Sequence, residues 1–373
     1  MMKWKKKTIS KEKVIDKNIL ILLVLFMLGI LAAGCRHSLA LQDGSGNKID
    51  GLTQENGESD KDTIVVGFSQ VGAESDWRSA NTESMKSAFS RENGYELIFE
   101  DGQQKQTNQI MAIRTFIQRE VDYIVLAPVT ETGWDTVLQE AKDADIPVII
   151  IDRRVDVADE SLFTCWVGSD FELEGKKAAE WLNRYARTKG IAPEDIHIVN
   201  IQGTIGSSAQ IGRTKALSNA AREYGWDLIA EMPGDFTQAK GKEVMESVLR
   251  QYDNINVVYC ENDNEALGAI AAIEAAGKRA GSDITNGEIM VISFDGVNAD
   301  ALGYVKKDKI TAIVECNPFH GPRVASIIQQ LEAGKTPEKF SYVDEEVFSA
   351  NKTVISLSVD GEDYDVTILS EEN

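Results

Sequence analysis

Residues 147–154 read Pro-Val-Ile-Ile-Ile-Asp-Arg-Arg, an unbroken apolar run that ends in three charged residues. A strand without polar alternation is typical of a parallel sheet that is covered by helices on both faces. Val257–Cys260 followed by Glu261, and Ile289–Phe294 followed by Asp295, repeat this arrangement. Because ligands bind outside the carboxyl ends of such strands, the charged residues that follow them indicate a binding site.

Two series of such strands, each alternating with amphipathic segments, extend along the chain. The first runs from Ile64–Phe68 to Leu162–Val167, with the first helix expected at Asn81–Asn93, and the second from Ile196–Ile201 to Ile310–Glu315. A chain of 373 residues is also too long for one ordinary domain. The sequence therefore predicts an α/β fold of two doubly wound, Rossmann-like lobes with parallel sheets.

The composition excludes several classes of protein. Hydrophobic residues make up 43% and charged residues 27%, which is typical of a globular chain rather than a disordered one. A net charge of -21 offers no basic surface for nucleic acid. Only three His and four Cys occur, and no nucleophile–base motif accompanies them. We therefore expect a chain that is not an enzyme, without catalytic residues, cofactor or metal.

The first 34 residues differ in charge from the rest of the chain. They hold seven Lys against Glu12 and Asp16, a net charge of +5. Because the whole chain has a net charge of -21, the residues after position 34 carry a net charge of -26. The uncharged run Ile19–Ala33 follows, which is typical of a signal peptide. Residues 31–35, Leu-Ala-Ala-Gly-Cys, resemble the lipobox of bacterial lipoproteins, which implies lipid attachment at Cys35. An uncleaved N-terminal anchor is the alternative, and either places the acidic body outside the cytoplasmic membrane.

Two further segments flank the two series. Residues 35–62 are rich in Gly, Ser, Asp and Asn, and they predict a flexible tether that ends where the body begins at Thr63. Near the C-terminus, apolar and polar residues alternate on both sides of Asp360-Gly361, which predicts a β-hairpin.

The residues that follow the strands have the chemistry of carbohydrate recognition. Aromatic faces stack on the apolar C–H faces of a sugar ring, Asp and Asn accept hydrogen bonds from hydroxyls, and Arg donates to several oxygens. Each bond to a charged group contributes about 1.5–3 kcal/mol, which distinguishes stereoisomers. The candidates that follow strands are Trp77, Arg78, Asp152, Arg153, Phe236, Asn262 and Asp295, with Arg213 in the next helix.

Several longer motifs resemble galactofuranose-binding proteins of bacterial ABC sugar transporters, within the ribose/galactose-type (type 1) periplasmic sugar-binding family. The motifs are Val66–Gly72, Asp101–Gln106, Ala127–Val129, Gly234–Thr237 and Lys240–Ser247, with Ile151–Arg153 and Glu261–Asp263 shared across the broader family. The resemblance covers residues 63–345. It implies two lobes joined by three strand crossovers, near Cys165–Ser169, Glu315–Pro318 and Val343–Val347, which close on one sugar.

The same resemblance implies a set of ligand-binding residues. They are Glu74, Ser75, Trp77, Arg78, Asp152, Arg153, Arg213, Phe236, Asn262 and Asp295. Ala73 and Cys316 depart from the family pattern, so the identity of the sugar stays open. The resemblance also implies an N-terminal lobe of residues 63–166 plus 317–345, and a C-terminal lobe of residues 167–316 plus 346–373 that includes the hairpin.

The implied function is capture of a monosaccharide, galactofuranose or a related pentose or hexose, and its delivery to an ABC transporter permease. We expect a monomeric lipoprotein on the outer face of the cytoplasmic membrane, bound through the lipid on Cys35. One alternative is a sensor that presents its closed form to a membrane receptor kinase. A transcription regulator of the LacI type uses this fold too, but a secretion signal replaces its DNA-binding segment.

Several candidates have structural alternatives. Trp77 could pack on the surface, Phe236 could belong to the core, and Asp152 and Asp295 could be turn residues. Arg153 and Arg154 cannot both face the cleft if they point to alternate sides. Residues 203–208 lack the Gly-Lys-Ser/Thr ending of a P-loop, which favours a tight turn over a phosphate site.

Overall fold

The computed structural model describes residues 63–370. The predicted signal peptide of residues 1–34, the lipid-attachment residue Cys35 and the tether of residues 35–62 lie outside the described residues. Within the described part, no helix is both long and apolar enough to span a membrane.

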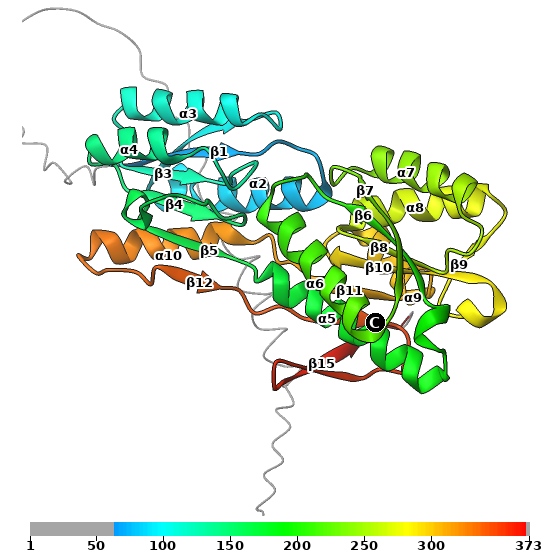
Figure 1. Ribbon diagram of the computed structural model, residues 1–373. Coiled ribbons are helices and arrows are strands. Elements are labelled where there is room, and N and C mark those ends of the chain that lie inside the picture. The colour runs from blue at the N-terminus through cyan, green and yellow to red at the C-terminus, as the bar shows by residue number, and fades with distance from the viewer. Residues whose placement is uncertain (1–62, 371–373) are drawn as a thin grey trace, which may run out of the picture. The chain divides into compact units, whose positions relative to one another are not determined.

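The first lobe is built on a six-stranded parallel sheet, with strand order β12-β5-β4-β3-β1-β2 among the described residues. In Figure 1 this lobe is blue to green, with α10 and β12 in orange. Its elements are β1 (Ile64–Gln70), α2 (Asp76–Ala88), η1 (Arg91–Asn93), β2 (Tyr95–Asp101), α3 (Gln106–Gln118), β3 (Tyr123–Leu126), α4 (Asp135–Asp143), β4 (Val148–Ile151), η2 (Glu160–Leu162), β5 (Cys165–Gly168), α10 (His320–Glu332) and β12 (Phe340–Tyr342).

The second lobe is built on a mixed sheet, with strand order β14-β15-β13-β11-β10-β8-β6-β7 and β9 beside β10. Its elements are α5 (Phe171–Lys189), η3 (Pro193–Asp195), β6 (His197–Gln202), α6 (Ser208–Tyr224), β7 (Asp227–Pro233), α7 (Gln238–Gln251), β8 (Val257–Cys260), α8 (Asp263–Ala275), β9 (Arg279–Ala280), η4 (Ile284–Asn286), β10 (Glu288–Asp295), α9 (Ala299–Lys306), β11 (Ala312–Glu315), β13 (Val347–Ser349), β14 (Ser356–Val359) and β15 (Glu362–Ile368). β14 and β15 form an antiparallel hairpin whose turn residues, Asp360 and Gly361, have φ of 53° and 90°.

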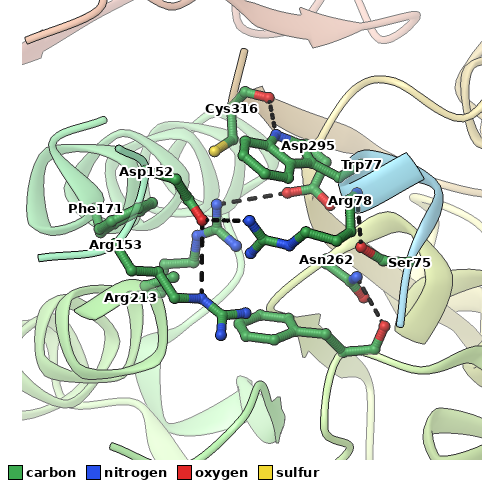
Figure 2. Close-up of a pocket in the computed structure, with 12 residues that line it drawn as sticks. Ser75, Trp77, Arg78, Asp152, Arg153, Phe171, Arg213, Asn262, Asp295 and Cys316 are labelled. Atoms are coloured by element: carbon green, nitrogen blue, oxygen red, sulfur yellow. Dashed lines mark hydrogen bonds and ion pairs between the residues drawn. The ribbon is translucent and has the colours of Figure 1, made fainter. Parts of the chain in front are cut away.

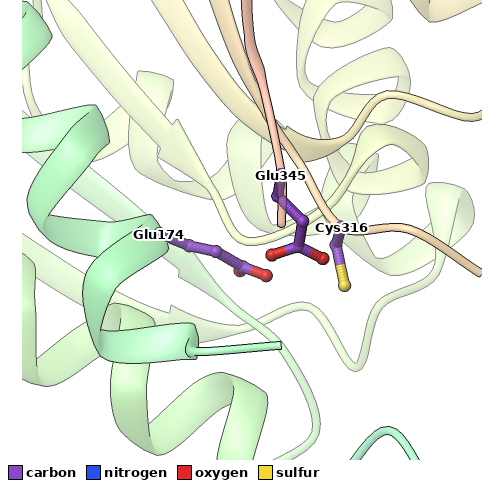
Figure 3. Close-up of side chains that lie close together, drawn as sticks. All are labelled: Glu174, Cys316 and Glu345. Atoms are coloured by element: carbon purple, nitrogen blue, oxygen red, sulfur yellow. The ribbon is translucent and has the colours of Figure 1, made fainter. Parts of the chain in front are cut away.

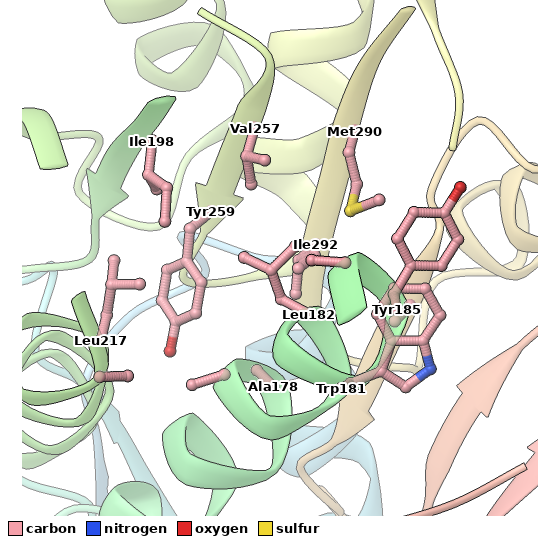
Figure 4. Close-up of a cluster of buried hydrophobic side chains, with 14 of the residues drawn as sticks. Ala178, Trp181, Leu182, Tyr185, Ile198, Leu217, Val257, Tyr259, Met290 and Ile292 are labelled. Carbon is pink, nitrogen blue, oxygen red and sulfur yellow. The ribbon is translucent and has the colours of Figure 1, made fainter. Parts of the chain in front are cut away.

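Each sheet buries both faces, as the continuous apolar strands require. In β10, Met290 and Ile292 point to the face covered by α5 and α6, whereas Ile289 and Val291 point to the opposite face. Trp181 and Tyr185 of α5 are stacked with ring centroids 5.4 Å apart on the first of these faces (Figure 4). The predicted fold class of two doubly wound α/β lobes is confirmed.

The chain passes between the lobes three times, after β5, after β11 and after β12. One side chain joins all three connections. Oε1 of Glu345, in the third, accepts hydrogen bonds from Oγ of Ser169 in the first (2.5 Å) and from the backbone N–H of Asn317 in the second (2.9 Å). The boundary predicted after residue 166 falls inside β5, which ends at Gly168.

Candidate functional site

Residues that end or follow strands of both lobes line one pocket (Figure 2). The empty space between the lining side chains, including the part that is open to solvent, is about 270 Å³. The lining residues are Ser75, Trp77, Arg78, Asp152, Arg153, Phe171, Ala209, Arg213, Phe236, Asn262, Asp295 and Cys316.

The structure brings nine of the ten predicted ligand-binding residues to this pocket. The exception is Glu74, which lies behind two of the lining arginines. Its Oε1 is 3.1 Å from Nε of Arg78 and 3.5 Å from a terminal nitrogen of Arg153. Glu74 therefore orients two donors instead of lining the pocket. The role of the other nine in ligand binding stays a prediction.

Trp77 and Arg78 lie in the first turn of α2, which begins five residues earlier than the predicted Asn81. Ser75 caps the helix, because its side chain accepts a hydrogen bond from the backbone N–H of Arg78. Trp77 is 4% exposed, and its Nε1–H donates to the carbonyl oxygen of Cys316 (2.6 Å). The Arg78 guanidinium lies 4.6 Å from the centre of the indole ring. The helix start thus fixes the direction of both side chains.

Every arginine that lines the pocket has a carboxylate partner. Arg78 is 2.8 Å from Oδ2 of Asp152, and Arg153 contacts Asp152 and Glu74. On the second lobe, Arg213 is 2.7 Å from Oε2 of Glu174 and 3.6 Å from Oδ1 of Asp295. The guanidinium charges are therefore balanced within the protein, and a bound ligand has no charge to supply.

The pKa values of the two carboxyl groups in the pocket shift in opposite directions. Burial alone would raise the pKa of Asp152, but the charges of Arg78 and Arg153 outweigh it and hold the pKa below its usual range. Burial raises the pKa of Asp295 well above its usual range, and Arg213 opposes this only in part. The arginine pair therefore favours the ionised form of Asp152 more strongly than Arg213 favours that of Asp295.

Phe236 contributes an aromatic face opposite the first lobe and has an uncommon backbone conformation, with φ of 60°. A non-glycine residue in this region costs about 1–3 kcal/mol and is held there by its surroundings. The Phe236 N–H donates to Oε1 of Glu265 (2.8 Å), and Nδ2 of Asn262 donates to the Phe236 carbonyl (3.0 Å). Asn262 therefore positions Phe236 as well as lining the pocket.

Sequence reasoning missed two lining residues, Phe171 and Ala209, and noted a third, Cys316, only as a departure from the family pattern. Phe171 and Ala209 lie at the starts of α5 and α6, and Cys316 follows β11. Phe171 directly follows the first connection between the lobes and Cys316 lies in the second, both outside the loops within a lobe where ligands were expected. Phe171 comes two residues after the predicted crossover at Ser169, so its position was a signal that could have identified it.

Arg154 does not line the pocket, whereas Arg153 does. The Arg154 guanidinium lies 4.4 Å from the centre of the Trp166 ring, within the first lobe. The alternation predicted for the two arginines therefore holds. Residues 203–207 lead into the α6 N-terminus, where the Ser207 side chain accepts from the Gln210 N–H.

Glu174, Cys316 and Glu345 place three possible metal-ligand atoms within 4.8 Å of one another, beside the pocket (Figure 3). The chemistry of this set does not fit a metal ion. The Glu174 carboxylate already pairs with Arg213, a fixed positive charge, and Glu345 already accepts two hydrogen bonds. Burial raises the pKa of both carboxyl groups and of the thiol, which disfavours the additional negative charge that a metal ion would need.

Comparisons with known proteins agree with this geometry. The galactofuranose-binding protein of Escherichia coli (strain K12) is 42% identical over 283 residues, which cover 74% of this chain and 85% of that protein. A Mycobacterium smegmatis structure in complex with β-D-fucofuranose is 40% identical with a TM-score of 0.72, covering 77% of this chain and 91% of that one.

A third relative is the periplasmic component of the arabinose ABC transporter from Shewanella sp. ANA-3, bound to α- and β-L-arabinofuranose. It is 40% identical with a TM-score of 0.69, covering 76% of this chain and 91% of that one. The family model described as a periplasmic binding protein domain matches residues 66–335. These matches confirm the resemblance inferred from the sequence motifs. The chain therefore belongs to the periplasmic binding protein family, and its two lobes have the type 1 arrangement.

Proposed function

We propose that this protein captures a neutral sugar in its furanose form outside the cytoplasmic membrane and delivers it to an ABC transporter permease. The observation that carries the proposal is the pocket between the lobes, in which aromatic faces stand beside charged groups that are already paired. Such a pocket binds hydroxyls strongly but gains nothing from a charge on the ligand.

The relatives narrow the class of sugar. Three related structures have names or ligands that specify galactofuranose, β-D-fucofuranose or L-arabinofuranose, which are all five-membered rings. L-Arabinofuranose and D-galactofuranose have the same arrangement of ring hydroxyls and differ in the group attached outside the ring. We therefore infer that ring hydroxyls are bound by Arg78, Asp152, Arg153 and Asp295, while Trp77 and Phe236 cover the ring faces.

Transport is favoured over sensing, because the name of the Shewanella relative identifies it as a component of an ABC transporter. In this proposal the protein performs no chemistry on the sugar. Binding shifts the equilibrium between open and closed lobes toward the closed form, which the permease then recognises.

Thermal unfolding of the purified protein with a panel of sugars tests this function. The panel contains L-arabinose, D-galactose, methyl galactofuranoside, D-ribose and the charged relative D-galacturonate. Selective binding at a hundredfold excess over Kd adds about 2.7 kcal/mol to the free energy of unfolding. We expect stabilisation by the first two sugars and none by galacturonate. Stabilisation by galacturonate, or by no sugar in the panel, would contradict the proposal.

Attachment to the membrane through Cys35 is a separate part of the proposal. It is supported by the Leu-Ala-Ala-Gly-Cys motif at residues 31–35. Cys35→Ala is expected to move the protein from the membrane fraction to the soluble fraction, with Cys165→Ala as the control that leaves it in place. If Cys35→Ala remains in the membrane fraction, the uncleaved anchor accounts for attachment instead.

A further inference from the structure

Three polar side chains connect the two lobes outside the pocket. Asp76 lies in the first turn of α2, on the first lobe, and does not line the pocket. Its backbone N–H donates to Oδ1 of Asn264 (3.0 Å), and Nδ2 of Asn264 donates back to Oδ2 of Asp76 (3.0 Å). Nδ2 of Asn298 donates to the same carboxylate oxygen. Asn264 and Asn298 belong to the second lobe, so these three residues form an interlobe clasp.

Both asparagines lie at helix N-termini of the second lobe. Asn298 is the N-cap of α9, where its Oδ1 accepts from the N–H groups of Asp300 and Ala301. Its backbone N–H donates in turn to Oδ2 of the buried Asp263 (3.2 Å). Asn264 is the second residue of α8 and is 9% exposed. The second lobe therefore presents two oriented amide donors to Asp76 without any contribution from a ligand.

The clasp is the charged part of a wider set of contacts between the lobes. Other contacts include two hydrogen bonds from backbone groups, from the Glu131 N–H to the Gly206 carbonyl (3.0 Å) and from the Arg154 N–H to Oγ of Ser208 (2.9 Å). The Arg153 guanidinium also lies 5.1 Å from the centre of the Phe236 ring. Hydrogen bonds to an ionised acceptor are stronger than bonds between neutral groups. Asp76 accepts two such side-chain hydrogen bonds from the second lobe and lies outside the pocket, so its removal tests interlobe contact without removing a pocket residue.

We propose that Asp76, Asn264 and Asn298 are positioning residues that set the sugar affinity by stabilising the closed form, without touching the sugar. This inference rests on the proposed function, because it concerns closure around the same ligand. A contact made only in the closed form raises the population of that form, and the observed Kd falls by the same factor. This factor is the same for every sugar, whereas a residue that contacts the sugar changes the Kd of each sugar by a different factor.

Asp76→Ala, Asn264→Ala and the double variant test the clasp by titration calorimetry with L-arabinose and with D-galactose. Each single variant is expected to weaken binding about fivefold to tenfold, by the same factor for both sugars. The double variant is expected to weaken binding by less than the product of the two single factors, because the side-chain bond between Asp76 and Asn264 is lost in both single variants. Asn264→Ala leaves α2 intact, so it separates the clasp from any effect on that helix.

Glu83→Ala is the matched control. Glu83 is an exposed acidic residue on the same helix, but its partner is Lys86 of that helix (3.1 Å), so its removal is expected to leave Kd unchanged. Unchanged affinity in Asp76→Ala, unequal factors for the two sugars, or additive effects in the double variant would each overturn the clasp.

Failure of the proposed function has a different signature, because the unsubstituted protein then binds neither sugar. Small-angle X-ray scattering without sugar tests the clasp in that case. Asp76→Ala is expected to give a larger radius of gyration than the unsubstituted protein and Glu83→Ala, and equal radii would overturn the clasp.

Discussion

Arg213→Met is expected to lower the free energy of unfolding by about 3–5 kcal/mol and to abolish measurable sugar binding. Arg213 is 2% exposed, and its guanidinium is the cation beside Glu174 and Asp295, which are themselves buried. Removing one member of a buried ion pair leaves the other charge without compensation, which accounts for the size of the effect. Denaturant unfolding and calorimetry measure the two effects separately.

Lys215→Met is the matched control for this change. Lys215 lies two residues further along α6 and pairs with Glu172 at 2.7 Å, but its side chain is 57% exposed. An exposed pair contributes about 0–1 kcal/mol, so this variant should unfold almost as the unsubstituted protein does. If Arg213→Met is no less stable than Lys215→Met, the buried network around Arg213 does not support the second lobe.

Gly203→Ala is expected to reduce sugar affinity by at least a hundredfold and to lower the free energy of unfolding by about 1–3 kcal/mol. A Cβ atom at residue 203 would lie 1.9 Å from Cζ of Phe236, so the ring must leave its position in the pocket. Calorimetry and denaturant unfolding measure the two effects. Adding Phe236→Leu to Gly203→Ala removes the ring that the new Cβ atom meets, so the double variant should regain stability. Its sugar affinity should stay low, because the aromatic face is then absent.

Gly303→Ala provides the comparison for this glycine, because a Cβ atom there meets no heavy atom within 4 Å. It should leave affinity and stability nearly unchanged. Full affinity in Gly203→Ala would show that the position of the Phe236 ring is not part of ligand binding.

The sequence predicted those pocket residues that directly follow apolar strands. Asp152 and Asp295 each follow an apolar run, and the geometry of a parallel sheet brings such positions to one edge. The indirect position of Glu74 was beyond this reasoning, since its partner Arg153 is 79 residues away and only the fold joins them. The start of α2 was placed too late because its first turn has few apolar residues and depends on the Ser75 cap.

The interlobe contacts were not predictable for a related reason. Asp76 and Asn264 are separated by 188 residues, and neither follows an apolar run in a way that indicates a partner. In the sequence they are ordinary residues of a helix N-terminus, and their pairing depends on how closely the lobes approach. Sequence patterns indicate helices, strands and the positions where strands end, but they do not indicate how closely the two lobes approach each other.

The three connections that meet at Glu345 limit how the lobes can move. A single linker would allow the second lobe to twist and slide as well as to open. Three linkers held together at Ser169, Asn317 and Glu345 leave rotation about one axis as the easy motion. Each closure then returns the same two walls to the same register, so discrimination between sugars is reproduced in every cycle of capture and release.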